Sequence, residues 1–508
     1  MKIKSYIIIA LLVFLGSSCK KSFLDINTNP NTLPTATPNF VFTTGLNKTT
    51  RNMVDPNLTG SFWSGQWTQS NSYITVTTWF VYIFTNNDFN YWDSYYDNMN
   101  DYQFVIDNAD ANNQKFLKGP AKIMKALMFH QLIDMYGNLP YTEALKGVKV
   151  LVPKYDDQKG VYEFLITLLD EAIADTKANA FSSAFADSDI VFKGNTAKWT
   201  KFANSLKLRL LMHQARVAGR DTYIKTEINK IVTEGSGFIT GEDVGSGGPG
   251  FYQPTAGKLN PFYQSFGYNA TGTRLASNDF PRLTQFLVNS LKVAKDTFRL
   301  KKIAYAIGGE GGTPGVSAKS ELAANYIGIP FGAPSGFAAS VSSSIGPSLI
   351  VKGQFNKPYI LMTAAEVQLN LAEAKERYDA GVNLPNDAKT YFEAGISESF
   401  RALGAGVANA AKYIGSGIQD YDYTASTNKL KAIAIQKWLA LCNFSGLEAW
   451  TEYRKTGYPV TPQSLQVPDP KRPVRFYYPS TESGSNGGNV TAQGEIDVFT
   501  SRLFWDVD

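Results

Sequence analysis

Apolar residues recur at spacings of three and four through much of this chain, and that spacing is typical of helices that bury one face. The stretches 161–173 and 199–210 both follow it. A further stretch has Pro120 at its start and the turn sequence 137–140 as its stop signal. We expect helices at 120–136, 161–173, 199–210, 363–378, 388–403 and 430–455. Short turns between them predict helical hairpins, and therefore a mainly α fold.

Two glycine-rich regions, 235–257 and 308–353, separate the helical stretches. Turn residues are too frequent there for long regular elements, so we expect ordered loops or short strands carried on the helical frame. The first region contains the pattern G-x-G-x-x-G at 245–250. A dinucleotide site needs these glycines between a buried strand and the start of a helix, and Pro249 is incompatible with that helix. The pattern predicts a loop.

The N-terminus has the composition of an export signal. Lys2 and Lys4 precede a wholly apolar run at 6–15, which is shorter than the roughly 20 residues that a membrane-spanning helix needs. Small residues then lead to Cys19, as in substrates of lipoprotein signal peptidase. We predict a signal peptide at 1–18 and a lipid on Cys19, which becomes the first residue of the mature protein.

A tether and one large domain are expected after the lipidated cysteine. Residues 20–39 are rich in Asn, Thr and Pro, which disfavours a helix and is typical of an extended spacer. We therefore predict a lipidated tether at 19–40 and a folded domain at 41–508. Loss of the two signal-peptide lysines lowers the formal net charge from +5 to about +3, too little for nucleic-acid binding.

The other cysteine and the two histidines give no sign of chemistry. Cys442 has no partner for an intrachain disulfide and lies in an apolar run, which predicts a buried, inert thiol. His130 and His213 lie in helical stretches without the neighbouring Glu and His of a zinc-hydrolase helix. We expect packed or surface histidines, and neither a metal nor a cofactor. The 44 carboxylates leave a glycosidase acid pair open, because its required spacing is spatial.

The segment 61–104 is unusually aromatic, with fifteen aromatic residues that include four of the eight tryptophans. An aromatic ring stacks on the apolar C–H face of a sugar, while amide and carboxylate side chains bond the hydroxyl groups. Polar residues that could supply the second part are interleaved with the rings: Asn71, Asn86, Asn87, Asp88 and Asn90. This composition favours a sugar-binding surface.

Trp79 is the best candidate for stacking on a ligand, because it follows a Thr-rich stretch where a loop is expected. We add Tyr73, Phe80 and Trp92 as further candidate ligand-binding residues. Trp63 and Trp67, four residues apart, fit one helix face and are predicted to be structural.

Several segments resemble, in order, the SusD/RagB family of nutrient-binding outer-membrane lipoproteins. The matches are the opening after Cys19 and four later motifs, at 23–31, 130–144, 364–374, 437–459 and 475–489. The resemblance implies a scaffold of tetratricopeptide-like helix pairs with a loop-rich ligand-binding region. It also implies a lipid-anchored, surface-exposed location at the outer membrane and a SusC-like TonB-dependent transporter as partner. Glu448, Arg454 and Pro140, which lie in these motifs, are expected to be structural or partner-facing.

Three functions remain open from the sequence. The leading hypothesis is non-enzymatic capture of glycans or oligosaccharides for the transporter. The second keeps the scaffold and partner but makes the ligand a peptide, paired backbone to backbone with the loop 245–257 near Tyr252. The third is a surface glycoside hydrolase.

Overall fold

The computed structural model describes residues 36–73, 77–469 and 471–507. The predicted signal peptide, Cys19 and most of the predicted tether lie outside these residues. Within the described part of the chain, no helix combines the length and the apolar character needed to span a bilayer.

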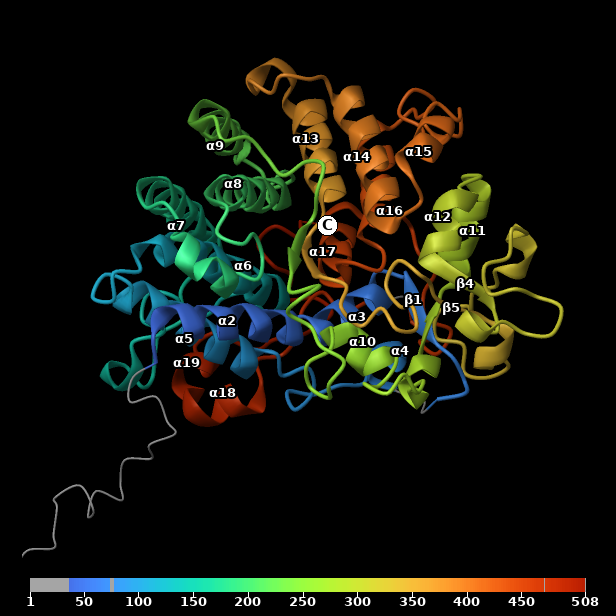
Figure 1. Ribbon diagram of the computed structural model, residues 1–508, viewed down its shortest axis with the longest axis horizontal. Coiled ribbons are helices and arrows are strands. Elements are labelled where there is room, and N and C mark those ends of the chain that lie inside the picture. Colours follow the sequence, from blue (N-terminus) through green and yellow to red (C-terminus); the bar gives the residue numbers. More distant parts are fainter. Residues whose placement is uncertain (1–35, 74–76, 470, 508) are drawn as a thin grey trace, which may run out of the picture.

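Helices dominate the structure (Figure 1). Those of the N-terminal half are α2 Pro38–Asn52, α3 Val54–Trp63, α4 Thr77–Val81, α5 Trp92–Asn108, α6 Lys118–Tyr136, α7 Gln158–Ala178, α8 Thr196–His213 and α9 Asp221–Glu234. The remaining ones are α10 Pro261–Phe266, α11 Gln285–Val293, α12 Thr297–Ile303, α13 Ala364–Tyr378, α14 Ala388–Leu403, α15 Val407–Tyr413, α16 Lys429–Leu441, α17 Gly446–Thr456, α18 Ser480–Ser485 and α19 Gly487–Thr491.

Successive helices pack as pairs and form the predicted tetratricopeptide-like scaffold. α5 packs on α6, α6 on α7, α7 on α8, α13 on α14 and α16 on α17. In Figure 1 these pairs follow one another round an arc, from α5 and α6 through α7 and α8 to α13, α14 and α16. The mainly α prediction is confirmed, and five of the expected helices appear as α6, α7, α8, α13 and α14.

Side-chain caps explain where several of these helices begin. Asp157 accepts a hydrogen bond from Gly160 N at 3.0 Å at the start of α7, and Asp387 accepts one from Thr390 N at 2.7 Å at the start of α14. Thr363 accepts from Glu366 N at 3.1 Å at the start of α13. Each cap satisfies an N–H group that has no partner within its own helix, which stabilises that end by about 1 kcal/mol.

Three local predictions are corrected. The expected helix 430–455 is two helices, because the chain turns at Asn443, whose φ of +71° is incompatible with a continuing α-helix. Trp63 and Trp67 are both buried as predicted, but α3 ends at Trp63 and Trp67 begins a strand. The tether prediction extends too far, because α2 begins at Pro38, where proline at the first helical position lacks only an N–H that would be unpaired anyway.

Two small antiparallel sheets lie among the loops. Strands β1 Trp67–Gln69, β3 Pro281–Leu283, β5 Ser343–Ile345 and β4 Ala304–Ile307 form one sheet in that order, with Trp67 opposite Leu283. Strand β2 Val244–Ser246 pairs with β6 Tyr359–Met362. The two glycine-rich regions are thus loops with short strands, as predicted. The glycine pattern at 245–250 overlaps β2 and no helix follows it until α10, so it lacks the strand-to-helix setting of a dinucleotide site.

Candidate ligand-binding site

A cavity of about 720 Å³, which we call the aromatic cavity, lies beside α2, α3 and α4. Six aromatic residues line it: Tyr73, Trp79, Phe89, Tyr91, Phe266 and Phe280. The other lining residues are mostly polar: Arg51, Asn52, Asp55, Leu58, Thr78, Asp88, Asn90 and Ser94. The volume is within the range of small-molecule sites, and the mixture of rings and hydrogen-bonding groups is typical of sugar sites.

Trp79 is held in a fixed position on α4 at the wall of this cavity. Its indole Nε1 donates to Thr59 Oγ1 at 2.9 Å, and its ring packs on Phe62 and Phe280 at centroid distances of 5.5 and 5.7 Å. The side chain is half-buried. Because packing and a hydrogen bond already fix the indole, little rotamer entropy remains to be lost when a ligand binds.

Tyr73 lines the same cavity and packs on Phe280 at 5.3 Å. The structure therefore brings together two of the four aromatic residues nominated from the sequence. Both contact the ring of Phe280, which follows them by about two hundred residues in the chain. Phe280 thus connects the two candidate stacking residues.

Phe80 and Trp92 are core residues, which corrects their nomination as ligand-binding residues. Phe80 has no exposed surface and packs on Phe62 and Phe331. Neighbouring residues on a helix point about 100° apart, so Phe80 faces the core while Trp79 faces the cavity. Trp92 is only 3% exposed and stacks on Tyr155. Neither ring has a face free for a ligand.

The sequence argument missed four aromatic residues at this cavity. Phe89 and Tyr91 belong to the aromatic segment that the composition identified, but nothing distinguished them from their neighbours. Phe266 and Phe280 come from outside it and carry no local signal. Phe89 has a φ of +54°, a left-handed conformation that bulky residues rarely adopt and that tends to occur at functional sites.

The polar residues nominated from the sequence divide into two groups. Asp88 and Asn90 line the aromatic cavity, whereas Asn71 holds a loop by accepting from Phe337 N at 2.8 Å. Asn86 and Asn87 are not lining residues. Asp55 also lies at the cavity, where desolvation by the surrounding protein raises the pKa of its carboxyl. The cavity therefore offers carboxylate and amide groups beside its rings.

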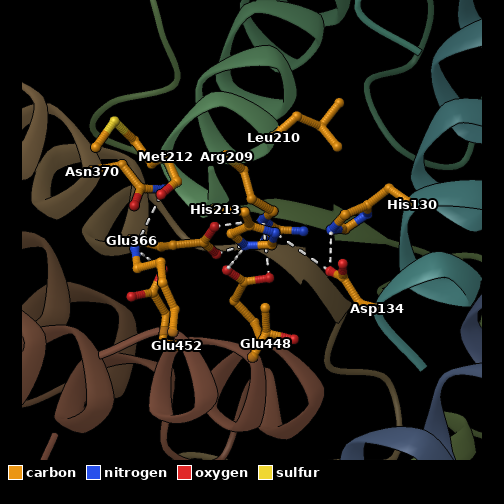
Figure 2. A network of polar contacts seen from close by, with 12 residues as sticks. His130, Asp134, Arg209, Leu210, Met212, His213, Glu366, Asn370, Glu448 and Glu452 are labelled. Carbon is orange, nitrogen blue, oxygen red and sulfur yellow. Dashed lines mark hydrogen bonds and ion pairs between the residues drawn. The ribbon is translucent and has the colours of Figure 1, made fainter. Parts of the chain in front are cut away.

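Both histidines lie in a buried polar network where α6, α8, α13 and α17 meet, shown in Figure 2. Arg209 on α8 donates to both carboxylate oxygens of Glu366 on α13, at 2.6 and 2.7 Å. One turn later on α8, the Nε2 atom of His213 lies 2.8 Å from Glu448 Oε1. These contacts tie three helices together across the scaffold.

Asp134 joins α6 to the same network. Its carboxylate lies 3.3 Å from His130 Nε2 and 3.4 Å from His213 Nδ1, and it accepts a hydrogen bond from Trp505 Nε1 at 3.0 Å. Tyr162 on α7 also donates its hydroxyl to this carboxylate. The network therefore connects four scaffold helices with α7 and the C-terminal segment.

The two histidines have opposite pKa shifts. Burial lowers the pKa of His130 to about 4, so that its ring is neutral at pH 7. Burial also opposes the charged form of His213, but the carboxylates of Glu448 and Asp134 outweigh it and raise the pKa to about 9. His213 is thus a buried cation paired with buried anions.

The network also bears on metal binding. Donor atoms of His130, His213 and Glu448 lie within 4.8 Å of one another. However, the Arg209 guanidinium approaches Glu448 at 3.5 Å, and protonated His213 already donates to that carboxylate. A metal ion would have to displace the proton of His213 and would then lie beside the Arg209 guanidinium. The donor set fits an ion-pair network between helices better than a metal centre.

The motif residues Glu448 and Arg454 are structural. Arg454 is buried on the face of Trp450, 3.6 Å from its ring centroid, and donates to the carbonyl oxygens of Asp134 and Val474 at 2.8 and 2.7 Å. The C-terminal motif acts similarly, because the side chain of Asn486 donates to Pro153 O at 2.9 Å. These residues join the C-terminal segment to the helical scaffold.

Comparison with known proteins agrees with this architecture. The model of a SusD-like family, described as starch-binding and associating with the outer membrane, matches residues 30–479. No curated protein sequence matches the chain.

Solved structures share the fold over nearly the whole chain. A SusD homologue from Bacteroides uniformis is 23% identical and covers 93% of this chain and 100% of its own, with a TM-score of 0.72. One from Bacteroides fragilis is 23% identical over 93% of this chain and 99% of its own, with a TM-score of 0.73. A chitin-binding SusD homologue from Flavobacterium johnsoniae is 22% identical over 93% and 99%, with a TM-score of 0.69. The chain belongs to the SusD-like family.

Proposed function

We propose that this protein captures glycans or oligosaccharides in the aromatic cavity at the outer membrane and delivers them to a SusC-like TonB-dependent transporter. The observation that carries the proposal is the position of Trp79 and Tyr73 on one cavity with Asp88 and Asn90. The rings supply stacking surfaces for sugars, and the carboxylate and amide supply partners for hydroxyl groups. Binding alone accounts for this arrangement, so we propose no catalytic step.

A peptide is the alternative ligand, and it has less support at the loop 245–257. The β2 strand that begins this region already pairs with β6, and Gly247 N donates to Ile190 O at 2.9 Å. Tyr252, which was expected near a peptide, is buried against this loop. Fewer backbone groups are therefore available for pairing with an extended chain, which favours the glycan.

Calorimetric titration of the mature chain against plant, host and microbial glycans and a peptide digest tests the proposal. We expect heat from at least one glycan class, with a dissociation constant in the micromolar to millimolar range. Trp79→Ala should weaken that binding about two- to tenfold, since an aromatic contact contributes about 0.5–1.5 kcal/mol. Heat from peptides alone would overturn the glycan assignment, and turnover of an oligosaccharide would establish a hydrolase.

Two further variants separate lost binding from lost folding. Asn90→Ala removes an exposed amide from the cavity and should weaken glycan binding, and it should lower the unfolding midpoint only slightly because its lost hydrogen bonds to Asp93 and Thr481 are exposed. Phe40→Ala removes an exposed ring at the opposite end of α2 from the cavity residues Arg51 and Asn52, and should leave binding unchanged. Equal losses in both variants would contradict a site at the aromatic cavity.

The anchor and the partner need separate tests. Radiolabelled palmitate should mark the wild-type protein and not Cys19→Ser, and equal labelling of both would refute lipidation at this residue. A gene for a SusC-like transporter immediately upstream would support the proposed partner. Direct binding of the purified transporter to the lipidated protein is the decisive measurement, and its absence would remove the delivery step.

A further inference from the structure

A second cavity, of about 360 Å³, lies where the loop region meets the helical scaffold. We call it the cationic cavity. Its walls come from α3, α10, α12, β6, the end of α14 and the start of α17. Among the described residues that line it, Lys302, Lys357 and Arg401 are cationic and none is acidic. It shares no lining residue with the aromatic cavity.

The three cations differ in how their charges are neutralised. Arg401 pairs with Asp243 at 2.7 Å and also with Glu398, so its charge is compensated within the protein. Within the described part of the chain, Lys357 donates only to neutral acceptors, the carbonyl oxygens of Pro347 at 2.6 Å and Ser348 at 3.2 Å.

Lys302, on the last turn of α12, has no recorded side-chain hydrogen bond or ion pair to any residue that the structure describes. Burial lowers the pKa of the Lys357 amine to about 8; the Glu310 carboxylate opposes this shift, and the Lys302 charge adds a smaller effect in the same direction as burial. Among the described residues that line the cavity, no carboxylate is present to pair with the two lysines, and an anion placed there would be attracted by both.

The walls of the cavity are fixed by hydrogen bonds between distant parts of the chain. Asn57 on α3 donates to the Tyr359 hydroxyl at 2.9 Å, and Asn443 donates to Ile303 O at 3.0 Å. Asn260 donates to Lys357 O at 2.9 Å and so fixes the backbone of that lysine. The cations thus lie on a preformed frame, which reduces the ordering cost of binding.

The other lining residues indicate which kind of molecule could carry the anionic group. Phe262, Leu349 and Phe444 give the cavity apolar lining in addition to its charged groups. Inorganic ions have no apolar surface to place against such walls, whereas the body of a small organic acid does. The volume is at the lower end of the range for small-molecule sites, which fits a single sugar unit or one amino-acid residue.

We propose that the cationic cavity binds a small organic acid whose carboxylate pairs with Lys302 and Lys357. The carboxylate has two possible sources, a uronic acid unit of a glycan or the C-terminus of a short peptide. The site is independent of the glycan site proposed above, because the two cavities are lined by different residues.

Calorimetric titration of the mature protein with glucuronate, glucose, inorganic phosphate, and an N-acetylated dipeptide with a free or amidated C-terminus tests this assignment. We expect glucuronate or the free-acid dipeptide to bind, with glucose and the amidated dipeptide at least tenfold weaker. The stronger of the two acids identifies the source of the carboxylate. Absence of binding by both acids, or equally tight binding of phosphate, would overturn the proposal.

Matched variants locate the binding. Lys302→Gln and Lys357→Gln should each weaken binding of the acid about tenfold or more, whereas Lys352→Gln, at an exposed lysine outside the lining, should not. Lys302→Gln disturbs no recorded side-chain contact within the described structure, so it remains informative if Lys357→Gln fails to fold. Trp79→Ala should leave acid binding unchanged, which separates this site from the aromatic cavity. Unaltered binding of the acid in both lysine variants would refute the proposed site at the cationic cavity.

Discussion

Replacing His213 with glutamine should remove a specific part of the pH dependence of stability. In the folded protein, the Glu448 and Asp134 carboxylates overcome the effect of burial and raise the pKa of His213 to about 9, against an ordinary value of 6.5. The folded state therefore holds one more proton than the unfolded state between these two values. The resulting stabilisation is fully present below about pH 6.5 and is lost as the pH rises through about 9.

The size of this effect follows from the same two values. A pKa difference between about 9 and 6.5 corresponds to about 3 kcal/mol, at roughly 1.4 kcal/mol per pKa unit. His213 is fully buried, so solvent screening reduces this figure little. Urea unfolding midpoints of the wild type and His213→Gln should be compared from about pH 6 to about pH 9.5. The difference in unfolding free energy between the two proteins should shrink by about 3 kcal/mol across that range.

His130→Gln is the matched control because the titration of His130 affects the acidic side of the plot of stability against pH. Burial lowers the pKa of His130 to about 4, so the unfolded chain binds the additional proton and stability falls as the pH drops from about 6.5 to about 4. This variant should keep the alkaline loss of stability that is expected of the wild type. If His213→Gln and the wild type instead have parallel profiles above pH 6.5, the buried cation assigned to His213 is wrong.

Single contacts elsewhere in the fold give three further tests. Gly446→Ala should lower the free energy of unfolding by about 1–3 kcal/mol, because the added methyl would lie 2.0 Å from Asn57 O; an unchanged urea midpoint would contradict this. Arg209→Met should lower it by about 3–5 kcal/mol, since Glu366 is left buried without its cation, and adding Glu366→Leu should restore most of the loss. Cys442, whose thiol pKa is raised by burial, should react with a thiol reagent only after unfolding, and rapid labelling of the folded protein would refute this.

Helix positions were the most predictable part of this protein. The spacing of apolar residues and the turn residues at each end are local signals, and α14 lies at the expected 388–403. The break between α16 and α17 was harder to predict from the sequence. Asn443 lies inside a long apolar pattern, and its left-handed conformation is set by side-chain hydrogen bonds to Ile303 and Ser348, more than ninety residues away.

The candidate ligand site was only partly predictable. Aromatic density selected a segment that contributes Trp79 and Tyr73 to the lining of the aromatic cavity. Density cannot separate a ring that faces a ligand from one that fills the core, so Phe80 and Trp92 were assigned wrongly. Phe280 reaches the cavity from a distant segment, and no pattern near it in the sequence indicates this.

The sequence by itself determined the elements that depend on neighbouring residues: the amphipathic helices, their caps and the glycine-rich loops between them. Only the tertiary structure decided which side chains meet. Arg209, His213, Glu366 and Glu448 form one charged network because three helices converge, and Lys302 and Lys357 share one cavity because a loop returns to the scaffold. Charge pairing and burial depend on distances through space, and residues far apart in the chain acquire those distances only when the helices pack.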